Sequence, residues 1–430
     1  MLLAKDQIER FVRRHLEKRS LCLRLSQKEG SPLYILEPDV LRARARRFSR
    51  AFGEQFPDCR FYFAVKSNHH PAVCQTLLEE GFGLDVSSGK ELETALALSA
   101  GDVIFTGPGK TDSELALAVK NFGTVTILID SFRELQALEG FAAAGGAVVR
   151  AGVRLCTQPT GLWRKFGIPL DGLPDFFETA QGCPHVDLQG IQFHTSWNLS
   201  PKAQTDFITL LGNKLATLPA PMVEKIRFVD VGGGYWPEPG EWIRLVRPAM
   251  DGTGAAASQA ADPNRCHRPA VPIETFAEEL GRAVKVHLGF LSPCRVCFEP
   301  GRWICNDAMH LMMTVMDKKA PDLVVTDAGI NAIGWERFDT DYFPILNLSN
   351  PSLSEKPCQI CGSLCTPEDH FGFSYLGDRI DCGDLLLLPC QGAYTYSLKQ
   401  EFIKPTPKVV VLERRGEGPR TADGEGGDSL

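Results

Sequence analysis

One lysine stands where an apolar stretch ends, and this position gives its amine chemistry of its own. Residues 61–65 read Phe-Tyr-Phe-Ala-Val, and Lys66 follows directly. A continuous apolar run of this length is typical of a buried strand, so Lys66 is expected at the strand's end. Burial disfavours the charged amine, and a neutral amine can form a Schiff base with a carbonyl. A surface lysine just past a strand fits the same pattern, so other motifs must decide between the two.

Two further apolar runs end in groups that could act on a flat, charged ligand. His194 closes the run Gly190-Ile-Gln-Phe-His194 and could stack on a ring or move a proton. Glu299 and Arg302 lie in Phe298-Glu-Pro-Gly-Arg302, where a buried carboxylate could keep a ring nitrogen protonated and the guanidinium could pair with phosphate. The alternatives are a core histidine and an ion pair between Glu299 and Arg302 at a turn.

A glycine-rich turn follows another apolar run, in Asp230-Val-Gly-Gly-Gly-Tyr235. Three glycines in succession let the backbone approach an anion and donate N–H groups to it. If this run is the seventh strand of a barrel, the turn lies where barrel enzymes often hold phosphate. A tight turn without a ligand is the alternative.

These groups need a scaffold that brings strand ends together, and the chain has the pattern of one. Eight short apolar runs alternate with helix-like segments. This alternation predicts an α/β fold with a (β/α)8 barrel, whose chemistry lies at the carboxyl ends of the strands. The eight runs are 61–65, 84–87, 103–106, 125–130, 147–155, 188–194, 226–231 and 295–299.

The predicted barrel spans residues 37–298 and is flanked by segments of other character. Residues at about 248–272 are rich in Gly, Ala, Ser, Asp and Pro and are expected to be a flexible insertion. Residues 299–413 contain strand-like runs without long helices, which predicts a C-terminal β-sandwich or β-barrel domain that also includes residues 1–36. Residues 414–430 are rich in Gly and Glu and are expected to be a disordered tail.

Composition argues against several functional classes. The chain has 430 residues, of which 43% are apolar, enough for a large core and about two domains. A net charge of −7 without a basic stripe argues against nucleic-acid binding, and no apolar run is long enough for a transmembrane helix. Charges interrupt residues 1–18, unlike a signal peptide, so we expect a cytoplasmic protein whose 14 cysteines are reduced.

In this order, the motifs resemble those of the fold-type III pyridoxal-phosphate decarboxylases, the family of diaminopimelate and ornithine decarboxylases. The resemblance covers about residues 31–411. It implies a (β/α)8 barrel with a β domain, the cofactor pyridoxal 5′-phosphate, and a head-to-tail homodimer with active sites at its interface. The motifs are Phe63-Ala-Val-Lys-Ser-Asn68, Asp85-Val-Ser-Ser-Gly-Lys-Glu91, Arg164-Lys-Phe-Gly-Ile168, His194, Gly232-Gly-Gly234, Glu299-Pro-Gly-Arg302, Asp327-Ala-Gly329, Cys361-Gly-Ser-Leu-Cys365 and Gly392-Ala-Tyr394.

The resemblance also implies a role for each matching residue. Lys66 would hold the cofactor as a Schiff base, His194 would stack on its pyridine ring and Glu299 would contact the ring nitrogen. Cys365, from a second protomer, would return a proton to the carbanion left by carbon dioxide. The supporting residues would be Asp85, Glu91 and Arg154 near the ring, Gly232, Gly233, Gly234, Arg302 and Tyr394 around the phosphate, and Lys165 with Asp369 as a salt bridge across the dimer.

The substrate end departs from the family pattern. Thr366 follows Cys365, whereas ornithine- and diaminopimelate-type enzymes place an acidic residue there, and Trp197 replaces a serine. The substrate is expected to contact Asp327, Arg337 and Thr366. The Cys-Thr-Pro pattern resembles decarboxylases of siderophore and other specialised pathways, so the predicted substrate is an amino acid joined to citrate or a carrier. The alternative is meso-diaminopimelate, as in lysine biosynthesis.

Other classes of function fit the sequence less well. Cys294 and Cys297, and Cys358 and Cys361, form two CxxC pairs, but their separation exceeds that of a zinc ribbon and we expect no metal. A non-catalytic homologue would be expected to lack Lys66 or Cys365. A pyridoxal-phosphate racemase is a further alternative function.

Overall fold

The structure is a computed structural model that describes residues 1–244, 265–334, 341–412 and 420–421. It divides into two compact units. The barrel unit contains Leu41–Glu238 and Ala270–Ile304, and the β unit contains Met1–Val40, Pro239–Pro269 and Cys305–Leu430. The predicted substrate residue Arg337 lies outside the described residues, as do most of the expected insertion and tail.

The barrel unit contains a closed parallel sheet, so the predicted (β/α)8 barrel is confirmed. Its strands follow the order β5-β4-β3-β2-β12-β9-β8-β6, and the pairing of β5 with β6 closes the ring. The short strand β7 (Ile168–Pro169) pairs with β6. Each predicted apolar run overlaps one barrel strand: β2 (Cys59–Ala64), β3 (Gly83–Val86), β4 (Val103–Phe105), β5 (Val125–Ile129), β6 (Val149–Cys156), β8 (Val186–Phe193), β9 (Phe228–Asp230) and β12 (Arg295–Phe298).

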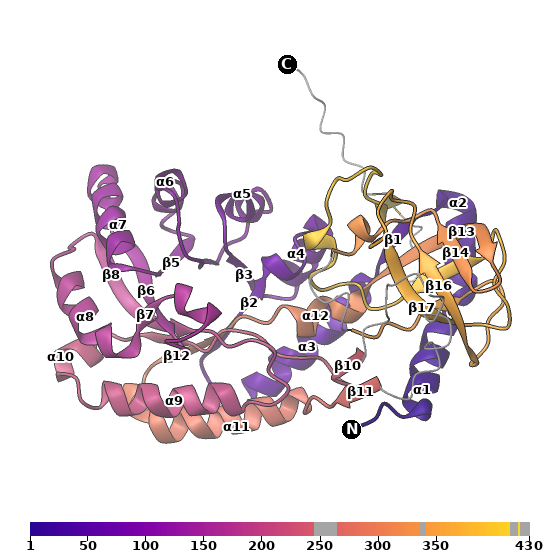
Figure 1. Cartoon of the computed structure of the whole chain (residues 1–430). Helices are drawn as coiled ribbons and strands as arrows, with labels where there is room; N and C mark the ends of the chain where they lie inside the picture. Colours follow the sequence, from indigo (N-terminus) through magenta and orange to yellow (C-terminus); the bar gives the residue numbers. More distant parts are fainter. Residues whose placement is uncertain (245–264, 335–340, 413–419, 422–430) are drawn as a thin grey trace, which may run out of the picture. The chain divides into compact units, whose positions relative to one another are not determined.

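Helices connect these strands and lie outside them, as Figure 1 shows for α9 and α11. Several begin at serine or threonine residues whose side chains accept an amide hydrogen bond in the first helical turn: Ser88, Thr111 and Ser131. The helices are α3 (Pro38–Gly53), α4 (Pro71–Glu79), α5 (Gly89–Ala97), α6 (Asp112–Lys120), α7 (Phe132–Gly145), α8 (Leu173–Gln181), α9 (Lys202–Leu215), α10 (Ala220–Val223) and α11 (Ile273–His287).

Side chains fill the barrel interior near the amino ends of the strands. Phe228 packs against a buried cluster of Tyr62, Ile104, Leu128 and Cys297. Its ring occupies space that two glycines leave open, because a Cβ on Gly190 would lie 2.1 Å from Phe228 Cζ and one on Gly152 would lie 2.9 Å from it. Large and small residues on neighbouring strands therefore complement one another inside the barrel.

The β unit contains a mixed sheet that includes the N-terminal strand. The strand order is β14-β16-β17-β15-β18-β13-β1-β19-β20, in which β1 pairs antiparallel with β13 and parallel with β19. The strands are β1 (Leu33–Leu36), β13 (Met309–Ala320), β14 (Leu323–Thr326), β15 (Leu346–Asn347), β16 (Glu355–Cys361), β17 (His370–Leu376), β18 (Leu385–Leu388), β19 (Lys408–Val411) and β20 (Arg420–Thr421).

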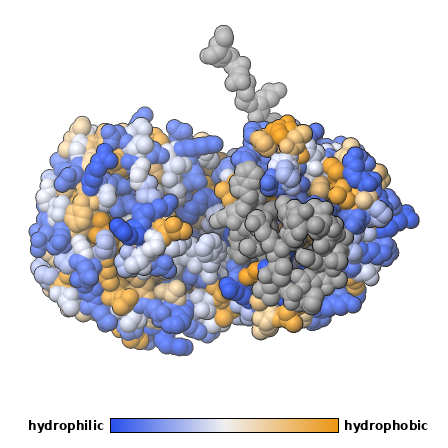
Figure 2. Space-filling model, in the orientation of Figure 1, coloured by the Kyte–Doolittle hydropathy of each residue, from blue (hydrophilic) through white to orange (hydrophobic). Residues whose placement is uncertain are grey.

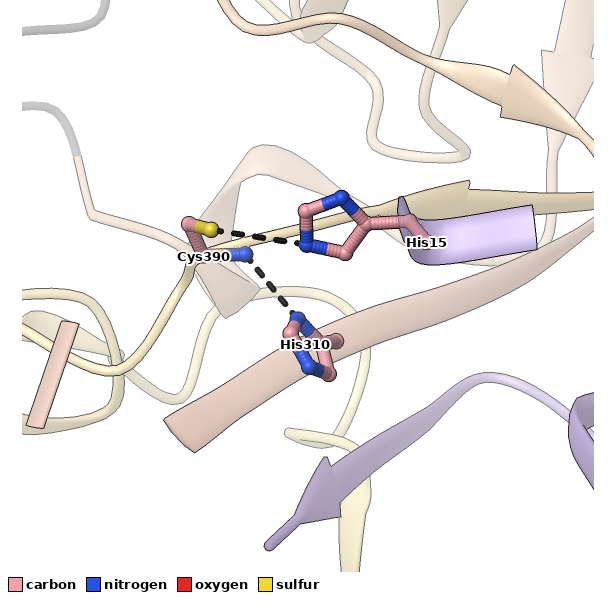
Figure 3. A group of neighbouring side chains, drawn as sticks. All are labelled: His15, His310 and Cys390. Carbon is pink, nitrogen blue, oxygen red and sulfur yellow. Dashed lines mark hydrogen bonds between the residues drawn. The ribbon is translucent and has the colours of Figure 1, made fainter. Parts of the chain in front are cut away.

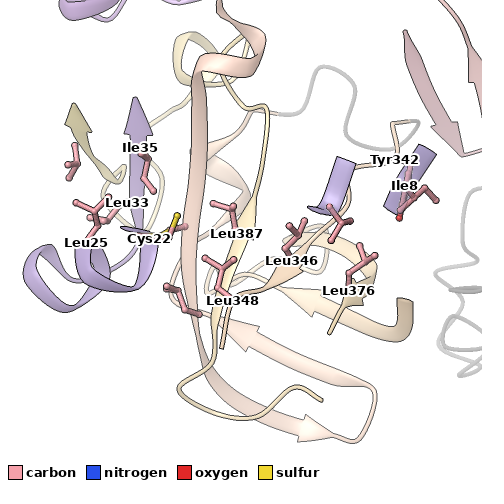
Figure 4. Packing of buried hydrophobic residues seen from close by; sticks show 14 of the residues in the cluster. Ile8, Cys22, Leu25, Leu33, Ile35, Tyr342, Leu346, Leu348, Leu376 and Leu387 are labelled. Atoms are coloured by element: carbon pink, nitrogen blue, oxygen red, sulfur yellow. The ribbon is translucent and has the colours of Figure 1, made fainter. Parts of the chain in front are cut away.

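Two N-terminal helices, α1 (Lys5–Leu16) and α2 (Arg19–Glu29), pack on this sheet. Ile8 and Val12 of α1, and Cys22 and Leu25 of α2, join a buried cluster with strand residues such as Leu387 (Figure 4). The hairpin of β10 (Glu241–Arg244) and β11 (Arg265–Arg268) also belongs to the β unit. Residues 265–268 fall within the expected flexible insertion, and in the structure they form β11 and pair with β10.

Hydrophobic and hydrophilic residues are intermixed on the face seen in Figure 2. Among the helices that the structure describes, none combines the length and hydropathy needed to cross a bilayer.

Candidate active site

The amine of Lys66 lies beside a buried carboxylate at the carboxyl ends of two neighbouring barrel strands. Lys66 occupies a 3-10 turn (Val65–Ser67) directly after β2, and Asp85 lies in β3, which pairs with β2. The Lys66 Nζ atom donates to Asp85 Oδ2 at 2.6 Å. Asp85 is fully buried, whereas the Lys66 side chain keeps 33% of its surface exposed. Asp85 therefore orients the amine, and the exposed part of the Lys66 side chain leaves it accessible.

A second carboxylate, Glu299, follows β12, the strand on the other side of β2. Its Oε1 atom accepts from Gln192 Nε2 at 3.1 Å, and its Oε2 atom lies 3.5 Å from His194 Nδ1. Gln192 and His194 come from the end of β8 and share a face because strand side chains alternate. The structure therefore brings Glu299 and His194 together in the barrel unit, as the sequence predicts.

His194 is a neutral, oriented ring in this arrangement. The Gly233 amide donates to His194 Nδ1 at 3.1 Å, so this nitrogen carries a lone pair and the proton resides on Nε2. His194 Nε2 then donates to Ser196 Oγ at 3.2 Å. Burial lowers the pKa of His194, which keeps the ring neutral. The Trp163 ring lies 6.2 Å from the His194 ring, centroid to centroid.

The three glycines after β9 pack closely against neighbouring segments of the barrel unit. Gly232 and Gly234 adopt φ values of +71° and +83°, which favour glycine. The Gly232 amide donates to Asp230 Oδ1 at 2.8 Å, and the Gly233 amide donates to His194. These two amides donate within the protein in this structure, and the placement of the three glycines around a phosphate stays a prediction. Gly233 permits close packing, since a Cβ there would lie 2.1 Å from the Glu299 carbonyl oxygen.

We expect Gly233→Ala to destabilise the protein by about 1–3 kcal/mol, because the added methyl group must displace the Glu299 backbone. Unfolding in urea measures this change. Gly53→Ala is the matched control, since a Cβ on Gly53 at the end of α3 meets no atom within 4 Å. Equal unfolding midpoints for the two variants would contradict the packing role.

The buried carboxylates around Lys66 differ in protonation. Burial raises the pKa of Asp85 to about 7, although Lys66 opposes the shift. Burial and the neighbouring Glu299 raise the pKa of Asp230 well above its usual value, which favours its protonated form. Burial alone would raise the pKa of Glu299, but the positive charges of Lys66 and Arg154 act in the opposite direction, and its pKa lies below the usual value. Glu299 therefore carries the negative charge of this group.

The raised pKa of Asp85 predicts a pH-dependent stability. The folded state holds the Asp85 proton up to about pH 7, whereas the unfolded chain releases it near the ordinary value of 3.8. The folded state binds more protons in this window, so its stability falls as pH rises through it. We expect the cofactor-free wild type to lose stability relative to Asp85→Asn between these pH values. Urea unfolding at several pH values measures the difference, and parallel curves would contradict the assignment.

Glu91 and Arg154 support the site from neighbouring elements. Glu91 Oε2 accepts from the Ser87 amide at 2.7 Å and so fixes the turn after β3. Arg154, in β6, donates to Thr106 Oγ1 at 3.1 Å, and its guanidinium carbon lies 4.6 Å from the Phe166 ring centroid. Arg302, at the start of α12 (Arg302–Cys305), stacks on the Trp236 ring at 4.5 Å. Arg302 thus lies close to the glycine turn.

One buried ion pair, between Lys110 and Glu134, was not predicted from the sequence. Lys110 Nζ donates to Glu134 Oε1 at 2.7 Å and to the Gly107 and Leu128 carbonyl oxygens. Both side chains are almost fully buried, and together they tie the loop after β4 to β5 and α7. Removing one partner of such a pair typically costs about 3–5 kcal/mol. The signal in the sequence is weak, because the partners become neighbours only when the barrel closes.

The remaining predicted site residues belong to the β unit. Cys365 is exposed, in the loop between β16 and β17. The Thr366 hydroxyl donates to Glu368. Asp327 accepts from the Ser31 hydroxyl and from the Thr314 amide, so both of its oxygens serve its own unit. Tyr394 adopts a left-handed conformation, with φ of +57°. In this structure the Asp327 carboxylate contacts residues of its own unit, and its contact with substrate stays a prediction.

Asp369 makes structural contacts within its own unit. It is 3% exposed, and its oxygens accept from the Ile330 amide at 2.6 Å and from the Leu364 amide. Gly362 packs against the same carboxylate. The predicted salt bridge from Asp369 to Lys165 across a dimer stays a prediction beside these contacts. Asp369 fixes the loop that carries Cys365.

Comparisons with known proteins agree with this geometry. Residues 41–241 match the family model of the pyridoxal-binding domain of pyridoxal-dependent decarboxylases. A diaminopimelate decarboxylase of Methanothermobacter thermautotrophicus is 26% identical, over 91% of this chain and 89% of its own. The chain belongs to the fold-type III pyridoxal-phosphate-dependent decarboxylases.

Two further matches cover most of the chain. The 2-[(L-alanin-3-ylcarbamoyl)methyl]-2-hydroxybutanedioate decarboxylase of Staphylococcus aureus is 25% identical, over 84% of this chain and 89% of its own. A solved structure of Helicobacter pylori diaminopimelate decarboxylase complexed with L-lysine aligns with a TM-score of 0.75 at 20% identity, covering 93% of this chain and 95% of its own. At that identity the structural match supports the fold.

The cofactor of the decarboxylase is pyridoxal 5′-phosphate, and the barrel residues fit it. Lys66 offers a reachable amine with a buried carboxylate partner. Glu299 offers a buried anion for the pyridine nitrogen, and His194 offers a neutral ring face. Arg302 offers a cation beside the glycine turn for the phosphate.

Proposed function

We propose that this decarboxylase acts on an amino acid joined through its side chain to a larger polar group, such as an amide of citrate. The observation that carries the proposal is Thr366 directly after Cys365. Its hydroxyl is engaged with Glu368, and a threonine offers no charge to a distal ammonium group. The name of the Staphylococcus aureus relative describes such a conjugate, an amino acid linked by an amide to a hydroxybutanedioate.

The barrel residues divide the work of the reaction. Pyridoxal phosphate supplies the electron sink for the electron pair left by departing carbon dioxide. Lys66 provides the amine that binds the cofactor. This amine donates a hydrogen bond to Asp85 Oδ2, with 2.6 Å between Nζ and Oδ2. Glu299 would stabilise positive charge at the ring nitrogen, since it is buried and ionised. His194, fixed by Gly233 and Ser196, would orient the ring.

Proton return to the substrate is the proposed task of Cys365. Its exposure in its own unit is what a residue completing the site of a second protomer requires. The buried Asp369 holds the loop from inside, which keeps the cysteine oriented. The proposed assembly is therefore a homodimer with shared active sites.

A second candidate substrate is meso-diaminopimelate. The Methanothermobacter thermautotrophicus relative carries the name diaminopimelate decarboxylase, as do several other relatives of similar identity. Threonine at position 366 favours the conjugate over this substrate.

Carbon dioxide release from a substrate panel tests the proposal. The panel contains a citrate amide of 2,3-diaminopropionate, meso-diaminopimelate, ornithine and lysine. We expect kcat/KM to be highest for the amide, and Thr366→Asp to shift preference several-fold toward the free diamino acids, because a carboxylate can pair with their distal ammonium. Efficient turnover of meso-diaminopimelate by the wild type would overturn the proposed substrate. Loss of optical activity without carbon dioxide release would indicate a racemase.

A further inference from the structure

Three potential metal ligands converge in the β unit, in the group drawn in Figure 3. His15 comes from α1, His310 from β13 and Cys390 from the segment after β18. One ligand atom from each side chain lies within 4.8 Å of the other two. Within residues 1–244, 265–334 and 341–412, no other set of three or more His, Cys, Asp or Glu side chains converges in this way.

His15 presents a lone pair to the sulfur of Cys390. Its Nδ1 atom donates to the Phe11 carbonyl oxygen at 2.8 Å, which fixes the tautomer and leaves Nε2 without a proton. The Nε2 atom lies 3.7 Å from Cys390 Sγ. His15 is 6% exposed. An imidazole with an unprotonated nitrogen is the form that binds metals.

His310 is held by a carboxylate from behind. Its Nε2 atom donates to Glu37 Oε1 at 2.8 Å, and Glu37 also accepts from Lys18. Its Nδ1 atom accepts from the Cys390 amide at 3.0 Å, so the lone pair of Nδ1 faces Cys390. Metal-ligating histidines commonly donate their other nitrogen to a carboxylate in this way. Cys390 itself has a φ of +59°, an unfavourable conformation for a residue other than glycine.

We propose that His15, His310 and Cys390 bind one zinc-class divalent cation, through His15 Nε2, His310 Nδ1 and Cys390 Sγ, with water in the fourth position. The 3.7 Å between the nitrogen and the sulfur matches tetrahedral zinc, for which bonds of about 2.0–2.1 Å and 2.3 Å imply a separation of roughly 3.6 Å. On binding, the thiol releases its proton to solvent and His310 Nδ1 exchanges the Cys390 amide for the metal. The half-buried position of Cys390 gives both the proton and the amide access to water.

Such a cation would fasten the N-terminal helix to the sheet. The three ligands come from α1, β13 and the segment after β18, which are far apart in the chain but belong to one unit. The expected consequence is stabilisation of the β unit, independent of the Lys66 chemistry. The two CxxC pairs are not part of this site.

Metal content and a cobalt spectrum test the site. We expect the purified enzyme, incubated with Zn²⁺ and passed through a desalting column, to retain one equivalent of zinc per chain. His15→Gln and Cys390→Ser should each lose it, whereas Cys382→Ser, which removes an exposed cysteine, and Cys358→Ser, which removes one of a CxxC pair, should retain it. Co²⁺ in place of zinc should give a thiolate-to-cobalt charge-transfer band that Cys390→Ser abolishes.

Thermal unfolding provides a second measurement that controls for misfolding. Zn²⁺ should raise the unfolding midpoint of the wild type by several degrees and leave that of His15→Gln unchanged, because a ligand stabilises only the state that binds it. Circular dichroism verifies that each variant is folded before the comparison. Zinc retention unaffected by His15→Gln and Cys390→Ser, or no retention by the folded wild type, would overturn the proposal.

Discussion

Replacing Lys66 with alanine should reduce decarboxylase activity to background and abolish the visible absorbance of bound cofactor. Lys66 is the amine that the structure places beside Asp85 and close to Glu299 at the strand ends. Alanine removes the only group there that can bond covalently to an aldehyde among the residues argued to contact the cofactor. An absorbance spectrum and a carbon dioxide assay measure the two effects.

Two further lysine variants separate chemistry from charge. Lys66→Arg keeps a cation for Asp85 but cannot replace the amine, because arginine remains protonated, so it should also be inactive. Lys202→Ala removes an exposed lysine that pairs with Asp206 on α9 and should behave as wild type. A normal cofactor spectrum in Lys66→Ala would refute the assignment of the site.

The second large effect is expected for Cys365→Ala. General acid catalysis typically contributes about a hundred- to ten-thousand-fold, so kcat should fall by a factor in that range while the cofactor spectrum stays unchanged. Cys382→Ala is the matched control, because both cysteines are exposed in the β unit. A loss no greater than that of the control would exclude Cys365 as the proton donor.

Mixing two inactive variants tests whether the sites are shared. In a mixed dimer of Lys66→Ala and Cys365→Ala, one shared site regains both residues and the other loses both. Random reassociation into twofold dimers would restore roughly a quarter of the sites. Activity that stays at background after verified subunit exchange would show that each protomer supplies its own cysteine or none.

Apolar patterning predicted the barrel because parallel strands are buried on both faces. The runs that contain Phe63 and Val229 therefore stand out in the chain. The β10–β11 hairpin was missed because its strands are polar, with Glu241 and Arg244 facing Arg268 and Arg265. Lone polar strands give no hydrophobic signal, and only their pairing identifies them.

The active site was predictable where chemistry and strand ends coincide, as at Lys66, His194 and Glu299. The raised pKa of Asp230 and the Lys110–Glu134 pair were not, since both depend on burial and on neighbours distant in sequence. The backbone contacts of Asp369 were not predictable for the same reason. A carboxylate that binds two backbone amides cannot be distinguished in sequence from one that binds a lysine.

The Phe228 ring, which packs against Gly190 and Gly152, has a consequence for substrate entry and product release. Phe228 and its neighbours pack inside the strand ring near its amino end. We therefore expect the amino acid to enter, and carbon dioxide and the amine to leave, at the carboxyl end, where Lys66 lies. Release of the amine then has to precede entry of the next substrate, so amine product should compete with substrate for the free enzyme.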